Sequence, residues 1–195
     1  MATRLPFNAD LVIRAYMQGI FPMADENGEI RWYAPDPRAI IDLDRFHVSR
    51  RLARTVRQGR FEVRIDADFH GTVIDCSGRD ETWISGDILR VYTDLHRMGL
   101  AHSVECWRDG ARVGGLYGVA LGGAFMGESM FSARTDASKV ALVALVERLK
   151  ARGFTLLDTQ FMTPHLARQG AHTIPLAEYR RRLDQALSRH CRFAD

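Results

Sequence analysis

The amino-acid sequence predicts an α+β fold, and three features of its 195 residues support this class. Two apolar segments flank Arg-Asp-Gly at 108–110, which indicates a β-hairpin because Asp-Gly favours tight turns between strands. A third apolar segment, 124–132, follows at once, and helical patterns then enclose one further strand. Strands that are neighbours in sequence, followed by helix, strand and helix, are typical of α+β folds and not of doubly wound sheets.

Before the hairpin, hydrophobic periodicity predicts three helices and two short strands. They are a helix from Asn8 or Asp10 to Gln18, a strand at 30–34, a helix at 49–58, a strand at 61–65 and a helix at 85–98. Asn8 or Asp10 can cap the first helix, and Gly19, Gly59 and Gly99 follow the helix ends. Apolar and charged residues alternate in 61–65, as in a half-exposed strand.

From the hairpin onward, the same patterns predict strands at 102–107, 111–123 and 124–132, a helix at 136–153, a strand at 154–160 and a helix at 176–191. Asp136 can cap the first of these helices, and Gly153 can end it. The turn-rich Ser-Gly-Arg-Asp at 77–80 suggests a boundary between a small N-terminal domain (1–80) and a larger catalytic domain (81–195).

Composition and charge exclude several classes of protein. Hydrophobic residues make up 46% and charged residues 26%, as in globular proteins, and no apolar run approaches the ~18 residues of a membrane span. The first residues lack a secretory signal, so we expect a cytoplasmic protein without membrane contact. Three distant cysteines, and histidines without ligand spacing, predict neither a disulfide framework nor a metal site. The net charge of +3 permits a polyanionic partner, and the absence of heptads favours a monomer.

The segment 113–132, VGGLYGVALGGAFMGESMFS, contains six glycines. Glycine weakens a strand unless another group approaches the backbone closely. No Gly-Lys-Ser or Gly-Lys-Thr follows, so the segment is not a P-loop, and it lacks the strand–turn–helix setting of a dinucleotide site. The glycines alone are explained by a hairpin in a tightly curved sheet.

Glu128 interrupts the apolar run within this segment. Strand alternation predicts that Met126, Glu128 and Met130 share one face. A carboxylate between methionines is costly to bury unpaired, so it either pairs with an arginine or serves a site. Methionine adapts its shape, which suits a pocket for varied apolar side chains.

Asp158 and Gln160 form a second candidate site at the end of an apolar strand. They are two residues apart and therefore share a face. A carboxylate and an amide that emerge together can act on a polar substrate. The alternative is that Asp158 caps the turn that follows the strand.

Arg50, Arg54 and Arg57 are spaced at i, i+4 and i+7, so they line one face of a helix. Such a stripe can follow phosphates, or it can be an ordinary solvated face. Trp32 and Trp83 can stack on a nucleobase, or they can be core or rim residues.

These stretches together resemble the leucyl/phenylalanyl-tRNA–protein transferase family. The matching segments are AYMQGIFPM (15–23), WYAPDPR (32–38), TWI (82–84), LHRMGLAHSVECW (95–107), the glycine-rich 113–132, DASKVAL (136–142), LLDTQ (156–160) and HLARQGAHTIP (165–175). The resemblance implies transfer of Leu, Phe or sometimes Met from aminoacyl-tRNA to an N-terminal Arg or Lys of a protein, which marks that protein for bacterial N-end rule degradation. It also implies an acetyltransferase-like (GNAT-like) catalytic domain and no cofactor.

The resemblance implies roles for matching residues. Glu128 would bind near the α-amino group of the aminoacyl-adenosine end, and Asp158 and Gln160 would form a relay on the acceptor amine. The other roles are adenine stacking by Trp83, an apolar pocket of Leu116, Phe125 and Met130, and acceptor-stem binding by Arg50, Arg54 and Arg57.

Two departures from the family pattern modify these expectations. Familiar members have tryptophan after Ile-Phe-Pro, where this chain has Met23, so Met23 or Trp32 would help to hold the adenine. The family's N-terminal extension, with Pro-Asn-Gly and Gly-Gly-Asp-Leu, is also missing, so we expect a reduced N-terminal α/β domain.

The chemistry makes modest demands, because the aminoacyl ester is already activated and an α-amine has a pKa of about 7.7–8.0. An amide oxygen is a very weak base, so we expect Gln160 to orient the amine and Asp158 to support it electrostatically or take the proton. One alternative is an acyl-CoA N-acyltransferase on a similar fold, although no pyrophosphate-binding turn precedes the helix at 136–153. A nonenzymatic RNA-binding module is another alternative, but it leaves Glu128, Asp158 and Gln160 unexplained.

Overall fold

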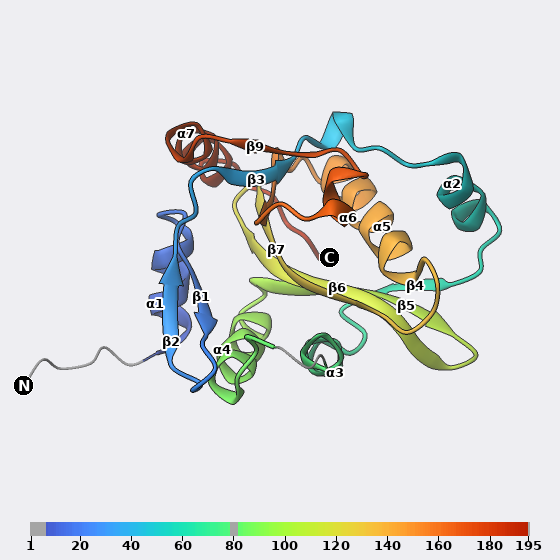
Figure 1. Ribbon diagram of the computed structural model, residues 1–195, viewed down its shortest axis with the longest axis horizontal. Helices are drawn as coiled ribbons and strands as arrows, with labels where there is room; N and C mark the ends of the chain where they lie inside the picture. The colour runs from blue at the N-terminus through green and yellow to red at the C-terminus, as the bar shows by residue number, and fades with distance from the viewer. Residues whose placement is uncertain (1–6, 79–81, 195) are drawn as a thin grey trace, which may run out of the picture.

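A seven-stranded sheet with helices on both faces forms the centre of the computed structural model, which describes residues 7–78 and 82–194 (Figure 1). In spatial order the strands are β4 (Glu62–Ile65), β5 (Ala101–Arg108), β6 (Ala111–Leu121), β7 (Ala124–Ser132), β8 (Leu156–Gln160), β3 (Arg38–Ile41) and β9 (Ala171–Ile174). All neighbouring pairs are antiparallel except β7 and β8, which are parallel. A separate antiparallel pair comprises β1 (Phe21–Ala24) and β2 (Ile30–Tyr33). The mixed sheet and its helices confirm the α+β prediction.

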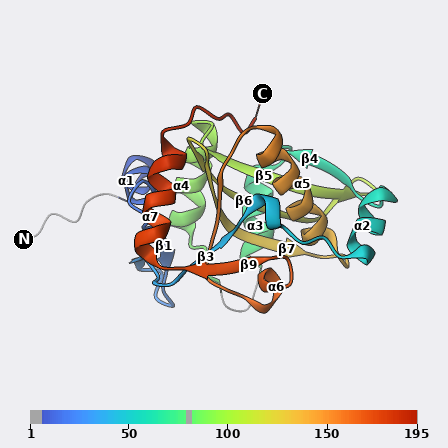
Figure 2. The same cartoon turned by 90° about the horizontal axis from the view of Figure 1, so that it is seen from above.

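The helices create a hydrophobic core on each face of the sheet. One face, the α4 face, packs against α1 (Ala9–Tyr16), α3 (Phe69–Ser77), α4 (Gly86–Arg97) and α7 (Leu176–Leu187). The opposite face, the α5 face, packs against α2 (Arg50–Arg57), α5 (Ala137–Ala151), α6 (Pro164–Ala167) and the 3-10 helix η1 (Leu43–Arg45). Figure 2 shows α5 lying across the sheet and α1 and α7 together at one end of it. In the described ranges, every helix falls short of the length and apolarity needed to span a bilayer.

Side-chain caps begin three helices, and the sequence predicted the cap of the first, at Asn8. Asn8 accepts a hydrogen bond from the N–H of Leu11 at 2.9 Å, and Ser49 and Ser85 cap α2 and α4 in the same way. Asp136 does not cap α5, contrary to the prediction, because its backbone is left-handed with φ 70° and its carboxylate instead pairs with Arg51 and Lys139.

Two glycines of the 113–132 segment are required by close packing. A Cβ at Gly114 would lie 2.4 Å from the Cβ of Ala137, where β6 meets the first turn of α5. A Cβ at Gly118 would lie 2.3 Å from the carbonyl oxygen of Met126 on β7. The prediction that sheet geometry explains these glycines is therefore confirmed at Gly118, whereas Gly114 is required by the helix that packs on the sheet.

The sheet includes two short strands that periodicity did not reveal, β3 and β9, and β3 bears on the predicted domain boundary. Four-residue β3 and β9 carry too few residues for a recognisable pattern, and all of β3 is buried. Strands β3 and β4 precede residue 80, yet they belong to the same sheet as β5 to β9. The 77–80 turn lies partly outside the described residues, and the division at residue 80 stays a prediction.

Candidate functional site

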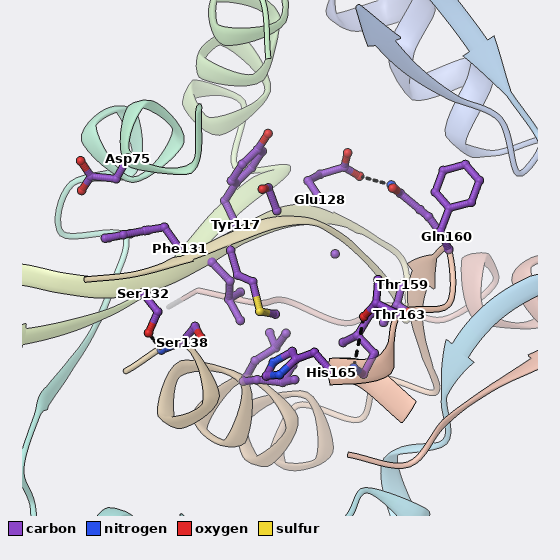
Figure 3. A pocket seen from close by; sticks show the side chains of 18 of the residues that line it. Asp75, Tyr117, Glu128, Phe131, Ser132, Ser138, Thr159, Gln160, Thr163 and His165 are labelled. Atoms are coloured by element: carbon purple, nitrogen blue, oxygen red, sulfur yellow. Dashed lines mark hydrogen bonds between the residues drawn. The ribbon is translucent and has the colours of Figure 1, made fainter. Parts of the chain in front are cut away.

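A cavity opens where two neighbouring strands of the sheet separate. β7 and β8 pair only through Ala124–Met126 and Leu156–Asp158. Beyond these residues β7 continues along β6, whereas β8 continues along β3. The resulting cavity measures about 800 Å³ and reaches from the α4 face to the α5 face of the sheet (Figure 3). This size is within the range of small-molecule sites.

A β-bulge places Glu128 at this cavity. The consecutive residues Tyr117 and Gly118 of β6 pair with residues 129 and 127 of β7, so Glu128 has no partner across the strands. The extra residue reverses the alternation that follows it. Met126 packs in the core of the α4 face, whereas Met130 packs against the core of the α5 face. The prediction that Met126, Glu128 and Met130 share a face is therefore wrong for Met130.

Three neutral donors surround the carboxylate of Glu128. Oε1 accepts hydrogen bonds from the hydroxyl of Tyr16 at 2.6 Å and from Nε2 of Gln160 at 2.9 Å. Oε2 accepts one from the hydroxyl of Tyr92 at 3.1 Å, and the two tyrosine hydroxyls also contact each other. The ion pairs within the described ranges do not include Glu128, so the alternative of an arginine salt bridge is not supported.

Burial raises the pKa of Glu128 to about 7, although its hydrogen bonds with Tyr16, Gln160 and Tyr92 lower it. The pKa values of both tyrosines are raised well above their ordinary value, first by burial and then by Glu128. Near neutral pH the site therefore contains two protonated phenols and a carboxyl group that is populated in both its protonated and its ionised form. A cationic amine in the cavity would favour the carboxylate form.

Asp158 is fully buried and does not line the cavity. Its Oδ1 accepts from Nε of Arg38 at 2.9 Å and from the backbone N–H of Gln160 at 2.8 Å. Its Oδ2 accepts from Nη2 of Arg38 at 2.6 Å and from the hydroxyl of Tyr179 at 2.8 Å. The bond to the Gln160 N–H confirms the alternative interpretation that Asp158 caps the turn after its strand.

Arg38 on β3 is the cation of this cluster and is also fully buried. Its guanidinium lies 4.7 Å from the ring centroid of Phe21 and 4.5 Å from that of Tyr179, and Nη1 donates to the carbonyl oxygen of Gly19 at 3.1 Å. Burial lowers the pKa of Arg38, but the contacts with Asp158 outweigh burial and leave the pKa raised. The charge is therefore permanent, and a bidentate ion pair of this kind restricts both partners.

Gln160 occupies a strained turn at the end of β8. Its φ is 65°, and the N–H of Phe161 donates to the carbonyl oxygen of Thr159 at 2.7 Å. A three-residue turn with positive φ at its centre is a γ-turn of the rarer, strained kind. Figure 3 shows the side chain of Gln160 pointing to Glu128. Nε2 of Gln160 donates to Glu128, and the amide oxygen Oε1 is therefore directed away from Glu128.

The apolar residues that line the cavity come from both faces of the sheet, with Leu116 and Met130 on the α5 face and Met23 and Trp83 on the α4 face. Leu116 and Met130 line an apolar part of the cavity, as predicted, together with Leu142, Leu145 and Leu157. Met23 and Trp83 line the same cavity.

Two predicted substrate-binding residues lie elsewhere. Phe125 of β7 is fully buried in the core of the α5 face, where its ring centroid lies 5.1 Å from that of Phe193. Trp32 pairs with Pro22 in the β1–β2 sheet, and residues on adjacent positions of a strand face opposite ways. Met23 therefore faces the cavity, whereas Trp32 lies in a second hollow beside α1.

Arg50, Arg54 and Arg57 are exposed on α2, while Leu52 and Thr55 of the same helix are buried. The three arginines are not among the residues that line the cavity. The exposed stripe has the geometry that the spacing predicted, and its role in binding tRNA stays a prediction.

A cluster of Asp66, His96 and His102 brings possible metal-donor atoms within 4.8 Å of one another. These residues come from different elements, so spacing in the sequence could not reveal them. His102 Nδ1 lies 2.7 Å from Asp66 Oδ2 and Nε2 lies 3.1 Å from the Gly99 carbonyl oxygen, while Asp66 also accepts from the Ser103 N–H. Hydrogen bonding within the protein thus accounts for the cluster.

Sequence reasoning assigned no role to Arg38, Tyr16, Tyr92 or Tyr179, although all four surround the site. Arg38 ends the WYAPDPR segment, and a charged residue next to apolar Ala-Ile-Ile was a signal for a buried ion pair. The tyrosines lie on helix faces with apolar neighbours, where the pattern does not separate a hydrogen-bonding phenol from a core residue.

Comparisons with known proteins place the sequence in a family. A family model described as "Leucyl/phenylalanyl-tRNA protein transferase" matches residues 40–184, and one for the N-terminal domain of these proteins matches residues 6–36. The chain is 64% identical over 178 residues to the leucyl/phenylalanyl-tRNA–protein transferase of Herpetosiphon aurantiacus, covering 91% of this chain and 93% of that protein. It is 57% identical over 179 residues to that of Rubrobacter xylanophilus, covering 91% and 94%.

Among solved structures, that of L-PGS from Bacillus licheniformis is similar with a TM-score of 0.44 and 16% identity, over 76% of this chain and 51% of that one. The relatives span nearly the whole chain at more than half identity, and the family model matches most of it. The chain therefore belongs to the leucyl/phenylalanyl-tRNA–protein transferase family.

Proposed function

We propose that the protein transfers Leu or Phe, and less readily Met, from aminoacyl-tRNA to the N-terminal Arg or Lys of proteins. The observation that supports this most is the arrangement of Glu128 and Gln160 at one cavity with an apolar part on one side and Trp83 on the other. The transferred products would be substrates of bacterial N-end rule degradation.

The cavity suits the two ends of an aminoacyl-adenosine. Leu116, Met130 and Leu142 would surround the apolar side chain. Glu128 would bind the α-ammonium group of the same residue, since a carboxylate next to a cation stays ionised. The adenine would stack on Trp83, with Met23 on its other side where the family commonly has tryptophan.

The reaction is aminolysis of an ester. The acceptor's neutral amine attacks the ester carbonyl, a C–N bond forms, the C–O bond to the terminal ribose breaks, and the amine proton passes to the departing ribose oxygen. Gln160 Oε1 would accept a hydrogen bond from the amine and aim its lone pair at the carbonyl carbon. Asp158 would hold the backbone N–H of Gln160 and would not take the proton, because its oxygens are buried and already accept four hydrogen bonds.

Two alternatives fit the site less well. An acyl-CoA transferase needs a phosphate-binding helix start, but the start of α5 is already occupied by the carboxylate of Asp136 and its partners Arg51 and Lys139. A nonenzymatic RNA-binding module gives no reason for the strained turn at Gln160.

The proposal also covers the fold of the catalytic domain, the location in the cell and the oligomeric state. We infer an acetyltransferase-like catalytic domain, supported by one parallel strand pair that separates around the cavity in an otherwise antiparallel sheet. The use of charged tRNA supports a cytoplasmic location, and the lack of heptad repeats in the sequence favours a monomer.

The test incubates the protein with labelled leucyl-tRNA or phenylalanyl-tRNA and a peptide that begins with Arg. The proposal expects label on that peptide and none on its N-acetylated form or on a matched peptide that begins with Asp. Binding of tRNA without transfer would support the RNA-binding module, and transfer from leucyl-CoA would support the acyl-CoA enzyme.

A further inference from the structure

The γ-turn at Gln160 depends on groups outside the turn. In a γ-turn the central residue's own N–H takes no part in the turn's hydrogen bond. The N–H of Gln160, at a residue only 5% exposed, donates to Oδ1 of Asp158 instead. An unsatisfied N–H at this depth would be costly, so the position of Asp158 determines whether the turn persists.

Asp158 is in turn held from two other elements. Arg38 on β3 donates to both carboxylate oxygens of Asp158, at 2.9 and 2.6 Å, and Tyr179 on α7 donates to Oδ2 at 2.8 Å. Phe21 and Tyr179 enclose the guanidinium between their rings. These contacts leave the carboxylate a single orientation, in which Oδ1 meets the N–H of Gln160.

The geometry points to Arg38 and Tyr179 as positioning residues that act on the reaction through Asp158 and Gln160. They fix a strained backbone conformation, and this conformation aims the Gln160 amide so that Nε2 meets Glu128 and Oε1 is presented to the acceptor amine. Neither Arg38 nor Tyr179 lines the cavity, so neither touches the substrate. This inference rests on the proposed function for its effect on rate.

A double-mutant cycle on the transfer rate tests the inference. Tyr179→Phe removes one hydroxyl, and Arg38→Lys keeps the charge but loses the bidentate grip. Each is expected to lower kcat by about 10- to 100-fold, since a displacement of about 1 Å can cost that much, with KM for aminoacyl-tRNA within about twofold of wild type. In a Gln160→Ala background, the same substitutions are expected to change kcat by less than about twofold.

Arg148→Lys is the matched control, because Arg148 on α5 also lies over an aromatic ring, 5.3 Å from the centroid of Phe193, but its Nε donates to the Phe193 carbonyl oxygen and not to Asp158. It is expected to keep wild-type kcat. The inference would be overturned if Tyr179→Phe or Arg38→Lys lowered kcat in the Gln160→Ala background by the same factor as in wild type. Wild-type kcat for Tyr179→Phe would also overturn it. Should Arg38→Lys fail to fold, Tyr179→Phe completes the cycle alone.

A second readout is independent of activity. Hydrogen exchange of the Gln160 backbone amide in the free protein is expected to be slow in wild type and Arg148→Lys, and at least about tenfold faster in Tyr179→Phe and Arg38→Lys. Equal exchange in all four proteins would overturn the inference that Arg38 and Tyr179 hold the turn at Gln160. An inactive wild type with a protected amide would instead refute the proposed function, and the inference about the turn would still hold.

Discussion

At the scale of single residues, the site is controlled by one carboxylate that sits among phenols and an amide instead of cations. Tyr16 and Tyr92 can satisfy Glu128 in either protonation state, because a phenol both donates and accepts. The side chain is thus prepared for an amine that arrives with the substrate. In contrast, Asp158 is committed to a permanent cation and serves the backbone.

The raised pKa of Glu128 predicts a pH-dependent stability. Its folded-state pKa is about 7 against an ordinary 4.5, so between these values the folded protein binds a proton that the unfolded chain releases. Stability contributed by this group is present below about pH 4.5 and lost as the pH rises to 7, up to about 3 kcal/mol. Glu128→Gln should therefore gain stability relative to wild type between pH 5 and pH 8, as measured by urea unfolding. A difference that stays constant over this range would contradict the raised pKa.

The bulge that places Glu128 depends on the absence of a side chain at Gly118. A Cβ there would lie 2.3 Å from the Met126 carbonyl oxygen and 2.4 Å from the ring of Phe125. Gly118→Ala is expected to cost about 1–3 kcal/mol or more by overpacking, measured as a lower urea midpoint. Gly86→Ala is the control, since a Cβ on Gly86 in α4 meets nothing within 4 Å, and it should be neutral or slightly stabilising. Equal stability of the two variants would show that the bulge tolerates a methyl group.

At the scale of secondary structure, elements with strong periodicity or clear caps were predictable, and short buried ones were not. The α1, α2 and α4 starts and the β5–β6–β7 meander were confirmed because capping residues and an Asp-Gly turn act locally. β3 was missed because its partners, β8 and β9, are more than one hundred residues away in sequence. The same distance hid Arg38, whereas Gln160 and Glu128 stood out as polar residues in apolar strands.

Helix α2 yields a prediction about nucleic-acid binding. Replacing Arg50, Arg54 and Arg57 by alanine should weaken tRNA binding and flatten the plot of log affinity against log salt by about 2–3, if each arginine neutralises one phosphate. Filter binding at several salt concentrations measures both effects. A triple variant of Arg90, Arg97 and Arg108 is the charge-matched control, because each of these already pairs with a neighbouring carboxylate. Identical slopes for the two triple variants would rule out the stripe as the tRNA contact.

At the scale of the whole molecule, one site is formed by residues that lie far apart in the sequence. Arg38 and Tyr16 come from the first quarter of the sequence, Tyr92 from the middle, and Asp158 and Tyr179 from the last quarter. The two family models match residues 6–36 and 40–184, and a division at residue 37, between the end of the first match and the start of β3, keeps the seven-stranded sheet in one piece.

This arrangement predicts how fragments of the protein behave. A fragment of residues 82–195 lacks β3 and β4, and it leaves Asp158 buried without Arg38, an unpaired charge that costs about 3–5 kcal/mol. We expect it to show no cooperative thermal transition by circular dichroism. A fragment of residues 37–195 keeps every strand of the large sheet and should melt cooperatively, yet it should be inactive because it lacks Tyr16, a donor to Glu128. Cooperative melting of the shorter fragment would place the domain boundary near residue 80, and activity in the longer one would show that Tyr16 is dispensable.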